Sequence, residues 1–211
     1  MPLPTFAPPA TPTPRAATLT RTQAAARLEL NPAGVDKLVR AGILSTPIKA
    51  EEVEQLTGRE RLQVTAGALT VLRTDAREQA DRAKYPQDPR RWMGFHVEHT
   101  DEELEAASLR WWRSDPSKVL DNELFVVTVA TFPVALYRIL GRADSITRND
   151  EDTPRHHYDG QLLARVHPGM SVTYAQDAPG HLRMMARQIM SSRTVVSSGG
   201  PIGYLEPGPA R

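Results

Sequence analysis

Two closely spaced helix-start signals near the N-terminus constrain the fold more than any other feature of the sequence. Thr20 is followed three residues later by Gln23, the pattern of a capping box, which predicts a helix over residues 21–28. Asn31 is a favourable N-cap, and Pro32 suits the first position of a helix because its missing N–H costs nothing there. The sequence therefore predicts two short helices joined by a tight turn.

The second helix is predicted to have one apolar side and a definite end. Val35, Leu38 and Val39 repeat at helical spacing, and Gly42 is placed to end the helix in a left-handed conformation. A third helix is expected over about residues 50–56. The three helices would form one small unit.

Composition divides the chain into a tail and two folded units. Residues 1–17 carry six prolines and too little apolar material to order themselves, so we expect a disordered tail. The helical unit is expected over 18–62 and a larger α+β domain over 69–205. Apolar and β-branched runs predict strands at 69–72, 92–97, 124–130, 134–140, 161–166 and 171–174, and helices at about 101–113 and 181–190. Pro133 is expected in a turn, and residues after Ser197 are expected to be mostly loop.

The run from Thr22 to Leu44 resembles the helix-turn-helix of excisionase and MerR-type proteins. The resemblance lies in the alanines at 24–25 and the Ala-Gly-Ile-Leu ending at 41–44. The basic wing hairpin usual in those families is not matched, because Ser45-Thr46-Pro47 leads directly to the next helix. The resemblance implies double-stranded DNA as the partner. It implies DNA contacts from Arg21 and Gln23 on the first helix and from Asn31, Ala33, Asp36, Lys37 and Arg40 on the second.

Local charge agrees with that expectation, although the formal net charge of the chain is only +1. Residues 15–49 hold six basic side chains and two acidic ones. This excess of positive charge would attract a phosphate backbone, and the attraction would weaken as the salt concentration rises. The basic residues are Arg15, Arg21, Arg27, Lys37, Arg40 and Lys49. The alternative is a helical packing module whose basic face is merely solvated, or one that binds protein.

Several segments of the larger domain together resemble PUA-like domains, the superfamily that includes the ASCH and EVE groups. The segments are 109–116, the paired strands at 124–130 and 134–141, 157–160, and 199–204. The resemblance implies a small β-barrel with helices over its openings, and a pocket with aromatic walls for a base or RNA. The candidate pocket residues are Trp92, Trp112, Tyr137, Arg138, His157, Tyr158 and Asp159.

Some of these residues have a structural alternative. Trp111 and Trp112 would lie about 100° apart on a helix, so both cannot face one interior, and we expect Trp112 to be the freer of the two. Trp111 is expected in the core. Arg138 is equally compatible with a pocket and with a salt bridge at the end of the sheet.

Several kinds of chemistry are not expected. The chain has no cysteine, which excludes disulfides and thiolate sites. His96 and His99 lack the helical zinc spacing, and the acidic run from Asp101 to Glu105 suits the first turn of a helix. There is no Gly-x-Ser-x-Gly elbow and no Walker loop. We therefore expect no metal, no cofactor and no catalytic residue.

The sequence hypothesis is a cytoplasmic, nucleoid-associated DNA-binding protein of bacterial or phage type, without membrane contact and possibly a homodimer. It would act as a regulator or as an accessory factor in recombination or modified-DNA recognition, with the second domain binding a base, RNA or a protein. One alternative is a protein-interaction adaptor. Another is a nucleic-acid-processing enzyme that uses His157 and Asp159 as acid or base.

Overall fold

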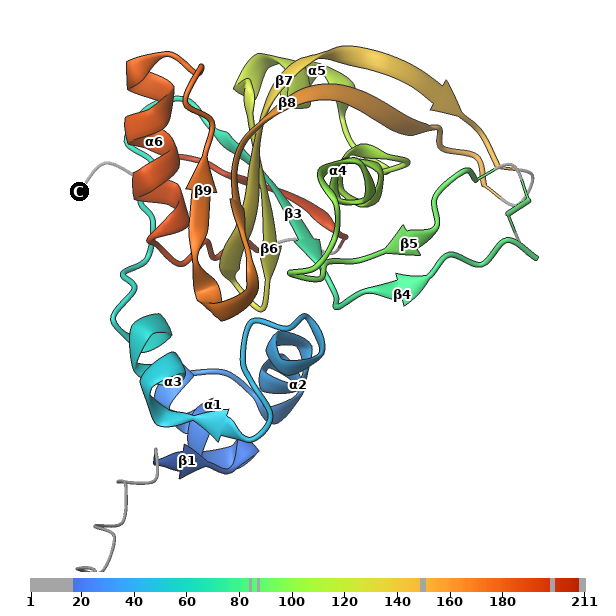
Figure 1. Cartoon of the computed structure of the whole chain (residues 1–211). Helices are drawn as coiled ribbons and strands as arrows, with labels where there is room; N and C mark the ends of the chain where they lie inside the picture. The colour runs from blue at the N-terminus through green and yellow to red at the C-terminus, as the bar shows by residue number, and fades with distance from the viewer. Residues whose placement is uncertain (1–16, 84, 87, 149–150, 198–199, 209–211) are drawn as a thin grey trace, which may run out of the picture.

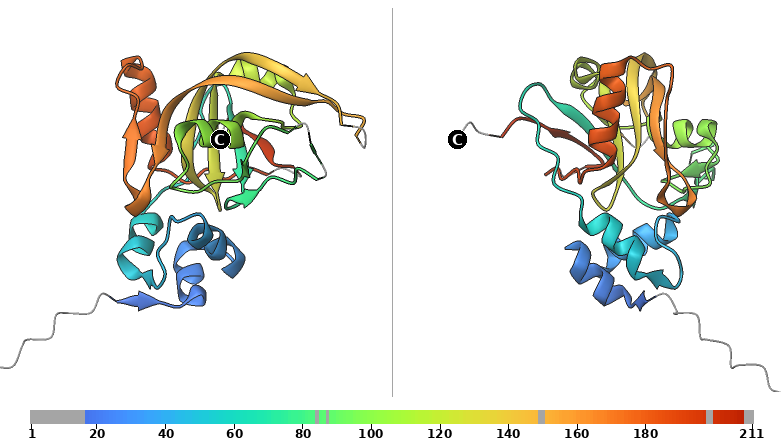
Figure 2. Two further views of the ribbon diagram at one scale, coloured as in Figure 1. Left: turned by 45° about the vertical axis from the view of Figure 1, so that its right-hand side comes forward. Right: turned by 60° about the vertical axis from the view of Figure 1, so that its left-hand side comes forward.

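The computed structural model describes residues 17–83, 85–86, 88–148, 151–197 and 200–208. The tail expected over 1–17 lies outside these residues except for Ala17. The described chain is α+β, with six α-helices and a six-stranded mixed sheet. A small helical unit lies against one end of a larger domain built on that sheet (Figures 1 and 2).

The helical unit contains α1 (Arg21–Leu28), α2 (Pro32–Arg40) and α3 (Ala50–Thr57), close to the predicted bounds. The capping box forms as expected: Thr20 Oγ1 accepts from the backbone N–H of Gln23 at 3.2 Å, and Gln23 Oε1 accepts from the N–H of Thr20 at 2.9 Å. Strand β1 (Thr18–Leu19) pairs with β2 (Ile48–Lys49) across the unit. The three helices bury a shared apolar core. Its members include Ala24, Leu28, Val35, Leu38, Val53 and Leu56.

The large sheet has the strand order β10-β3-β6-β7-β8-β9. Its strands are β3 (Leu69–Thr74), β6 (Leu124–Val129), β7 (Phe132–Ile146), β8 (Arg155–Val166), β9 (Val172–Tyr174) and β10 (Ile202–Leu205). Only β3 and β6 are parallel; the other pairs are antiparallel. The edge strands β9 and β10 are not paired with each other, so the sheet is open where the resemblance implied a closed barrel.

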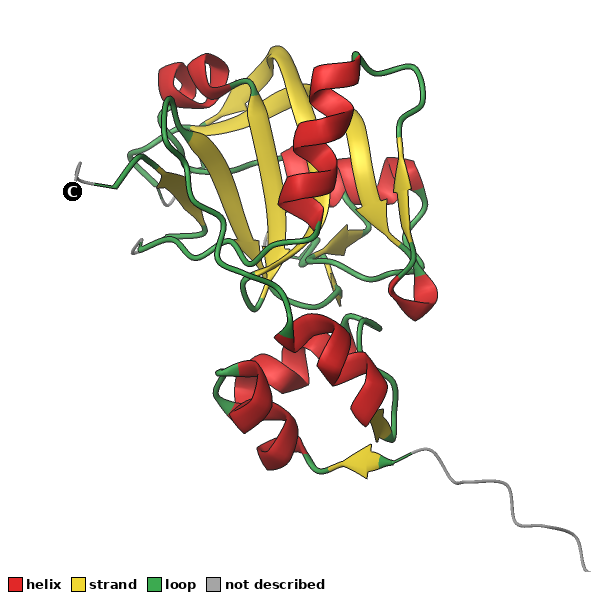
Figure 3. Cartoon of the chain, turned by 90° about the vertical axis from the view of Figure 1, so that its left-hand side faces the viewer, coloured by secondary structure: helices red, strands yellow, loops and turns green. Residues whose placement is uncertain are grey.

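The sheet is strongly curved and carries helices on both faces. Register shifts in the β7–β8 pairing bend these two strands into an arch. Helix α4 (Asp101–Leu109) lies in the hollow under the arch, and α6 (Gly180–Met190) packs on the opposite face (Figures 1 and 3). Helix α5 (Pro116–Asn122) lies near β3 and β7, the short helix η1 (Pro168–Met170) connects β8 to β9, and β4 (Glu78–Gln79) pairs with β5 (Trp92–Met93) beside α4.

The turn between β6 and β7 differs from the prediction. It is formed by Ala130 and Thr131, both with positive φ (48° and 77°), which is the backbone that a two-residue hairpin requires. Pro133 lies inside β7, opposite Thr128, where the register shifts. Because the hydrogen-bond ladder is irregular at this point, it tolerates a residue without an N–H. Pro133 therefore lies within the strand and not in the turn.

The two adjacent tryptophans are both buried, which corrects the expectation that Trp112 is free. Helix α4 ends at Leu109 rather than near Arg113, so Trp111 and Trp112 lie beyond the helix and the 100° helical spacing does not apply to them. They are 7% and 8% exposed. The backbone of Trp112 also pairs with that of His156 through two hydrogen bonds of 3.0 and 2.9 Å.

Other elements also differ from the sequence prediction, among them β8, which begins at Arg155 rather than at 161. Residues 202–205, expected to be loop, form β10, because the backbone of β3 offers them an antiparallel partner. The strand expected over 92–97 covers only Trp92–Met93. Helix α5 was not predicted, although Asp115 caps it and Pro116 begins it.

No helix in the described part of the chain combines the length and apolar character needed to cross a bilayer.

Candidate nucleic-acid interface

Helix α2 is fixed by its cap and by its buried side. Asn31 Oδ1 accepts from the backbone N–H of Gly34 at 2.7 Å and satisfies one of the donors left open at the helix start. Gly34, Val35 and Leu38 are buried against the rest of the unit. The opposite side of the helix is consequently turned outward.

The outward side of α2 carries Ala33, Asp36 and Arg40. Ala33 and Arg40 are exposed, and Asp36 is half-buried. Arg21 reaches across from α1, with its Nε 2.7 Å from Asp36 Oδ1. This ion pair neutralises the one carboxylate on the surface and holds the Arg21 guanidinium beside the helix. Exposed Asn31 and Gln23 border the surface, but their side chains are engaged in the two caps.

Lys37 lies on the flank of α2 that faces the larger domain. Its ammonium group is paired with the carboxylate of Asp75, the residue that follows β3. The side chain is still 38% exposed, so it is shared between solvent and the domain boundary. The sequence predicted Lys37 as a DNA contact without indicating this partner.

The local excess of positive charge is largely offset by ion pairs. Besides the pairs of Arg21 and Lys37, Arg27 lies 3.6 Å from Glu54 and Lys49 lies 3.8 Å from Glu52. Both glutamates belong to α3, just outside the window of residues 15–49. Of the basic residues of that window that the structure describes, Arg40 alone forms no ion pair with another described residue. Arg15 lies outside the described part of the chain.

The C-terminal end of α2 is docked on the larger domain. The carbonyl of Ala41 accepts from the backbone N–H of Val97 at 3.0 Å. Gly42 has φ +75°, and a Cβ placed there would come within 2.7 Å of Val97 Cγ2. On the other side of the unit, Arg193 Nη1 lies 3.3 Å from Glu29 Oε2. The outward side of α2 is therefore held in a fixed direction relative to the sheet.

Three of the predicted pocket aromatics are core residues. Tyr158 is 0% exposed, and Tyr137 and Trp112 are also buried. The hydroxyl of Tyr158 lies 2.7 Å from Ser114 Oγ, and Trp112 Nε1 donates to the carbonyl of Ser108 at 2.7 Å. Burial raises the pKa of both tyrosines. A side chain without exposed surface cannot line an open pocket, so α4 and the neighbouring segment fill the hollow in which a base pocket was expected.

The remaining predicted pocket residues lie on separate surfaces. Trp92 is half-exposed between the guanidinium groups of Arg77 and Arg91, at 4.9 and 5.0 Å, and its Nε1 donates to Glu103. Arg138 pairs with Glu123 at 2.6 Å, as one of its two interpretations predicted.

His157 and Asp159 lie on β8 at alternate positions. The ring of His157 packs edge-on against Trp111 at 5.5 Å, and its Nε2 accepts from Arg110 Nε at 3.1 Å. Burial and the Arg110 charge hold the pKa of His157 below its ordinary value, while Asp159 opposes them from an exposed position. Arg110 thus occupies the nitrogen that a general base would use.

Sequence reasoning missed a cavity at the boundary between α2 and the sheet, lined by Lys37, Arg73, Asp75, Thr131 and Thr194 among others. In the sequence, the only local indication of this cavity is the polar run that follows the apolar residues of β3.

No group of three or more His, Asp or Glu side chains suited to a metal ion occurs among the described residues. Comparison with protein-family models, with curated proteins and with solved structures found no match.

Proposed function

We propose that the chain binds duplex DNA through the outward side of α2, used as the recognition helix of a helix-turn-helix, while a PUA-like sheet domain holds that helix in place. The observation that carries the proposal is the outward side of α2, with exposed Ala33 and Arg40 and half-buried Asp36, which remains open although both ends of the helical unit contact the larger domain. An α-helix presented in this way fits the width of a major groove.

Each residue on this surface has a role compatible with groove binding. The side chain of Ala33 is small enough for close approach of the helix start, and apolar contact with a thymine methyl suits alanine. Arg40 has no competing carboxylate among the described residues, so it can bond a phosphate or a guanine edge. Arg21, held by Asp36, is placed to contact the backbone on the same side of the helix.

The test is duplex binding at low salt by the full chain and by the variant Arg40→Gln, followed by fluorescence anisotropy at several salt concentrations. We expect binding to random duplex, a roughly fivefold loss of affinity in the variant, and a salt slope smaller by about 1 because one phosphate contact is lost. The matched control is Arg142→Gln, since Arg142 is exposed on β7, away from α2. Absence of binding by the unaltered chain at low salt would reject the proposal.

A protein-binding role is the second candidate, and α6 favours it. Met184 is 69% exposed and Met185 is 43% exposed on a helix whose other side is buried in the sheet domain. Flexible, polarizable methionines suit protein contacts. A chain that fails to bind DNA but self-associates, with loss of association in Met184→Gln, would favour this role.

A further inference from the structure

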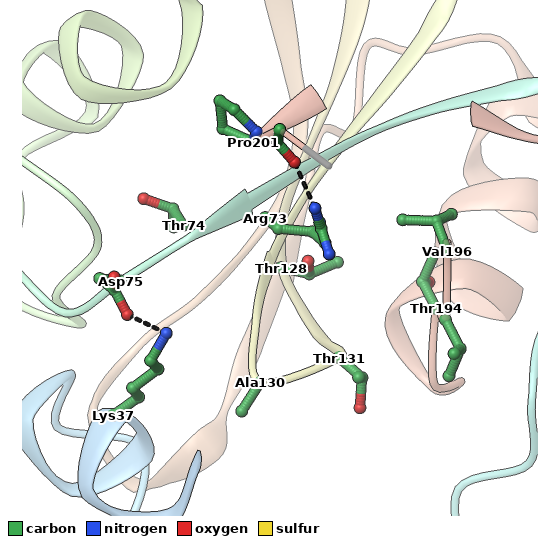
Figure 4. A pocket seen from close by; sticks show the side chains of 12 residues that line it. Lys37, Arg73, Thr74, Asp75, Thr128, Ala130, Thr131, Thr194, Val196 and Pro201 are labelled. Atoms are coloured by element: carbon green, nitrogen blue, oxygen red, sulfur yellow. Dashed lines mark hydrogen bonds and ion pairs between the residues drawn. The ribbon is translucent and has the colours of Figure 1, made fainter. Parts of the chain in front are cut away.

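The cavity beside α2 lies where the two parallel strands of the sheet end. Its volume is about 350 Å³, at the lower end of the range for small-molecule sites. β3 contributes Arg73 and Thr74 and is followed by Asp75, the turn after β6 contributes Ala130 and Thr131, and α2 contributes Lys37 from the other unit (Figure 4). The carboxyl ends of parallel strands are a common location for ligands in sheets with helices on both faces.

Two cationic groups line the cavity from different elements. Lys37 and Arg73 belong to α2 and β3, and Asp75 is the one acidic side chain among the described lining residues. Lys37 is paired with Asp75, but an ammonium group has three donor protons and can bond a second acceptor. Arg73 Nη2 donates to the carbonyl of Gly200, which anchors the guanidinium at the cavity wall. The charged groups of the lining therefore sum to one positive charge.

Two threonine hydroxyls in the lining have no hydrogen-bond partner among the described residues. Thr194 is 1% exposed, and its Oγ1 and that of Thr131 are both buried and unpaired. The two residues are adjacent, because the N–H of Thr194 donates to the carbonyl of Thr131 at 2.8 Å. By contrast, the hydroxyl of Thr128 in the same lining donates to the carbonyl of Leu72 at 3.1 Å. Buried hydroxyls are nearly always paired, and these two lie directly behind the cavity lining, where a turn of the threonine side chain would bring each hydroxyl to a ligand.

We propose that this cavity binds the phosphate group of a small phosphate monoester, independently of DNA binding by α2. Phosphate supplies several acceptor oxygens, and the site offers a guanidinium and an ammonium as donors, with the two threonine hydroxyls directly behind the lining. The cavity is larger than a phosphate alone requires, and Val196 and Pro201 provide an apolar wall for the organic part of the ligand. Because Lys37 belongs to both the cavity and α2, the ligand also contacts the proposed DNA-binding helix.

The test uses isothermal titration calorimetry of the full chain, without DNA, against ribose 5-phosphate, a nucleoside 5′-monophosphate and inorganic phosphate. We expect saturable binding of at least one monoester, weakened tenfold or more by Arg73→Gln and by Thr194→Val. Thr194→Val keeps the side-chain shape and removes a hydroxyl without a partner, so this variant is expected to be at least as stable as the parent. Arg142→Gln is the control and is expected to bind as the parent does.

The outcomes separate this site from the proposed DNA function. Arg40→Gln should leave the phosphate titration unchanged even where it reduces DNA binding, so failure of one proposal does not imply failure of the other. If no small phosphate binds but Arg73→Gln and Thr194→Val weaken duplex binding, the small-ligand proposal is refuted and the cavity contacts a phosphate of the DNA strand instead. If the parent binds neither, or if both variants bind as the parent does, the site is refuted.

Discussion

The ammonium group of Lys37 on α2 is paired with the carboxylate of Asp75 at the end of β3. A side chain of the proposed DNA-binding helix is thereby held by the sheet domain. The pair is partly exposed, with side-chain exposures of 38% and 59%, so water screens it and its contribution to stability is small. The pair can therefore open when a more favourable anion approaches Lys37.

Replacing Asp75 by asparagine tests whether this pair restrains DNA binding. In Asp75→Asn the ammonium of Lys37 no longer has a charged partner, so we expect about threefold tighter duplex binding and a salt slope steeper by up to about 1. The free energy of unfolding should change by less than about 1 kcal/mol. Anisotropy titrations and urea denaturation measure the two quantities. Unchanged affinity and slope would show that Lys37 does not contact DNA.

The contact between Gly42 and Val97 gives a second prediction, about the boundary of the two units. A Cβ at position 42 would lie 2.7 Å from Val97 Cγ2, and φ is +75°. Gly42→Ala should therefore cost about 2–4 kcal/mol, the sum of backbone strain and overpacking. Gly67→Ala is a matched control, because Gly67 also has a positive φ (+70°) but an added Cβ would meet nothing within 4 Å. Chemical denaturation of both variants isolates the packing contribution, and equal losses would contradict it.

The parts of this structure that sequence predicted depend on short-range signals. The capping box of Thr20 and the Asn31–Pro32 start involve residues within one helical turn, so the helices α1 and α2 could be placed without knowledge of the fold. The same kind of signal, Asp115 before Pro116, also marks the start of α5. Apolar runs likewise placed most of β3 and β6 and part of β7.

The parts that sequence did not predict depend on contacts between distant segments. A count of charges within residues 15–49 leaves out Asp75, which is distant in sequence from Lys37. It also does not show that glutamates of α3 pair with Arg27 and Lys49. Nor could composition distinguish a pocket tyrosine from a core tyrosine, because Tyr158 is buried by elements far from it in the chain. The cavity beside α2 likewise combines residues from both units.

A core role for Tyr158 gives a third prediction. Tyr158→Phe removes the hydrogen bond to Ser114 and should cost about 1 kcal/mol of unfolding free energy, without changing duplex or phosphate binding. Ser114→Ala and the double variant complete a mutant cycle that measures the coupling of the two hydroxyls. The double variant should be less destabilised than the sum of the single variants. A selective loss of ligand binding in Tyr158→Phe would instead support the aromatic pocket that the sequence predicted.

Buried His99 gives a fourth prediction, a loss of stability in mild acid. Burial, followed by the charge of Arg77, lowers the pKa of His99 to about 4, and neither ring nitrogen has a hydrogen-bond partner in the described part of the chain. In the unfolded chain the pKa is near 6.5. Between these pH values the unfolded chain binds more protons, so stability is full above about pH 6.5 and is lost as the pH falls toward 4.

The size of that loss and its assignment to His99 can be measured by urea denaturation between pH 7.5 and 4. We expect His99 to account for about 2 kcal/mol after allowance for solvent screening. His99→Leu should be tolerated at pH 7.5, since no hydrogen bond is lost, and should flatten this part of the pH dependence. His181→Gln, at an exposed position on α6, is the control and should keep the slope of the parent. A parent-like slope in His99→Leu would assign the acid sensitivity to other groups, such as the carboxyl of Asp88. Burial acts to raise the pKa of Asp88, but the hydrogen bonds and the ion pair with Arg90 outweigh it and hold that pKa low.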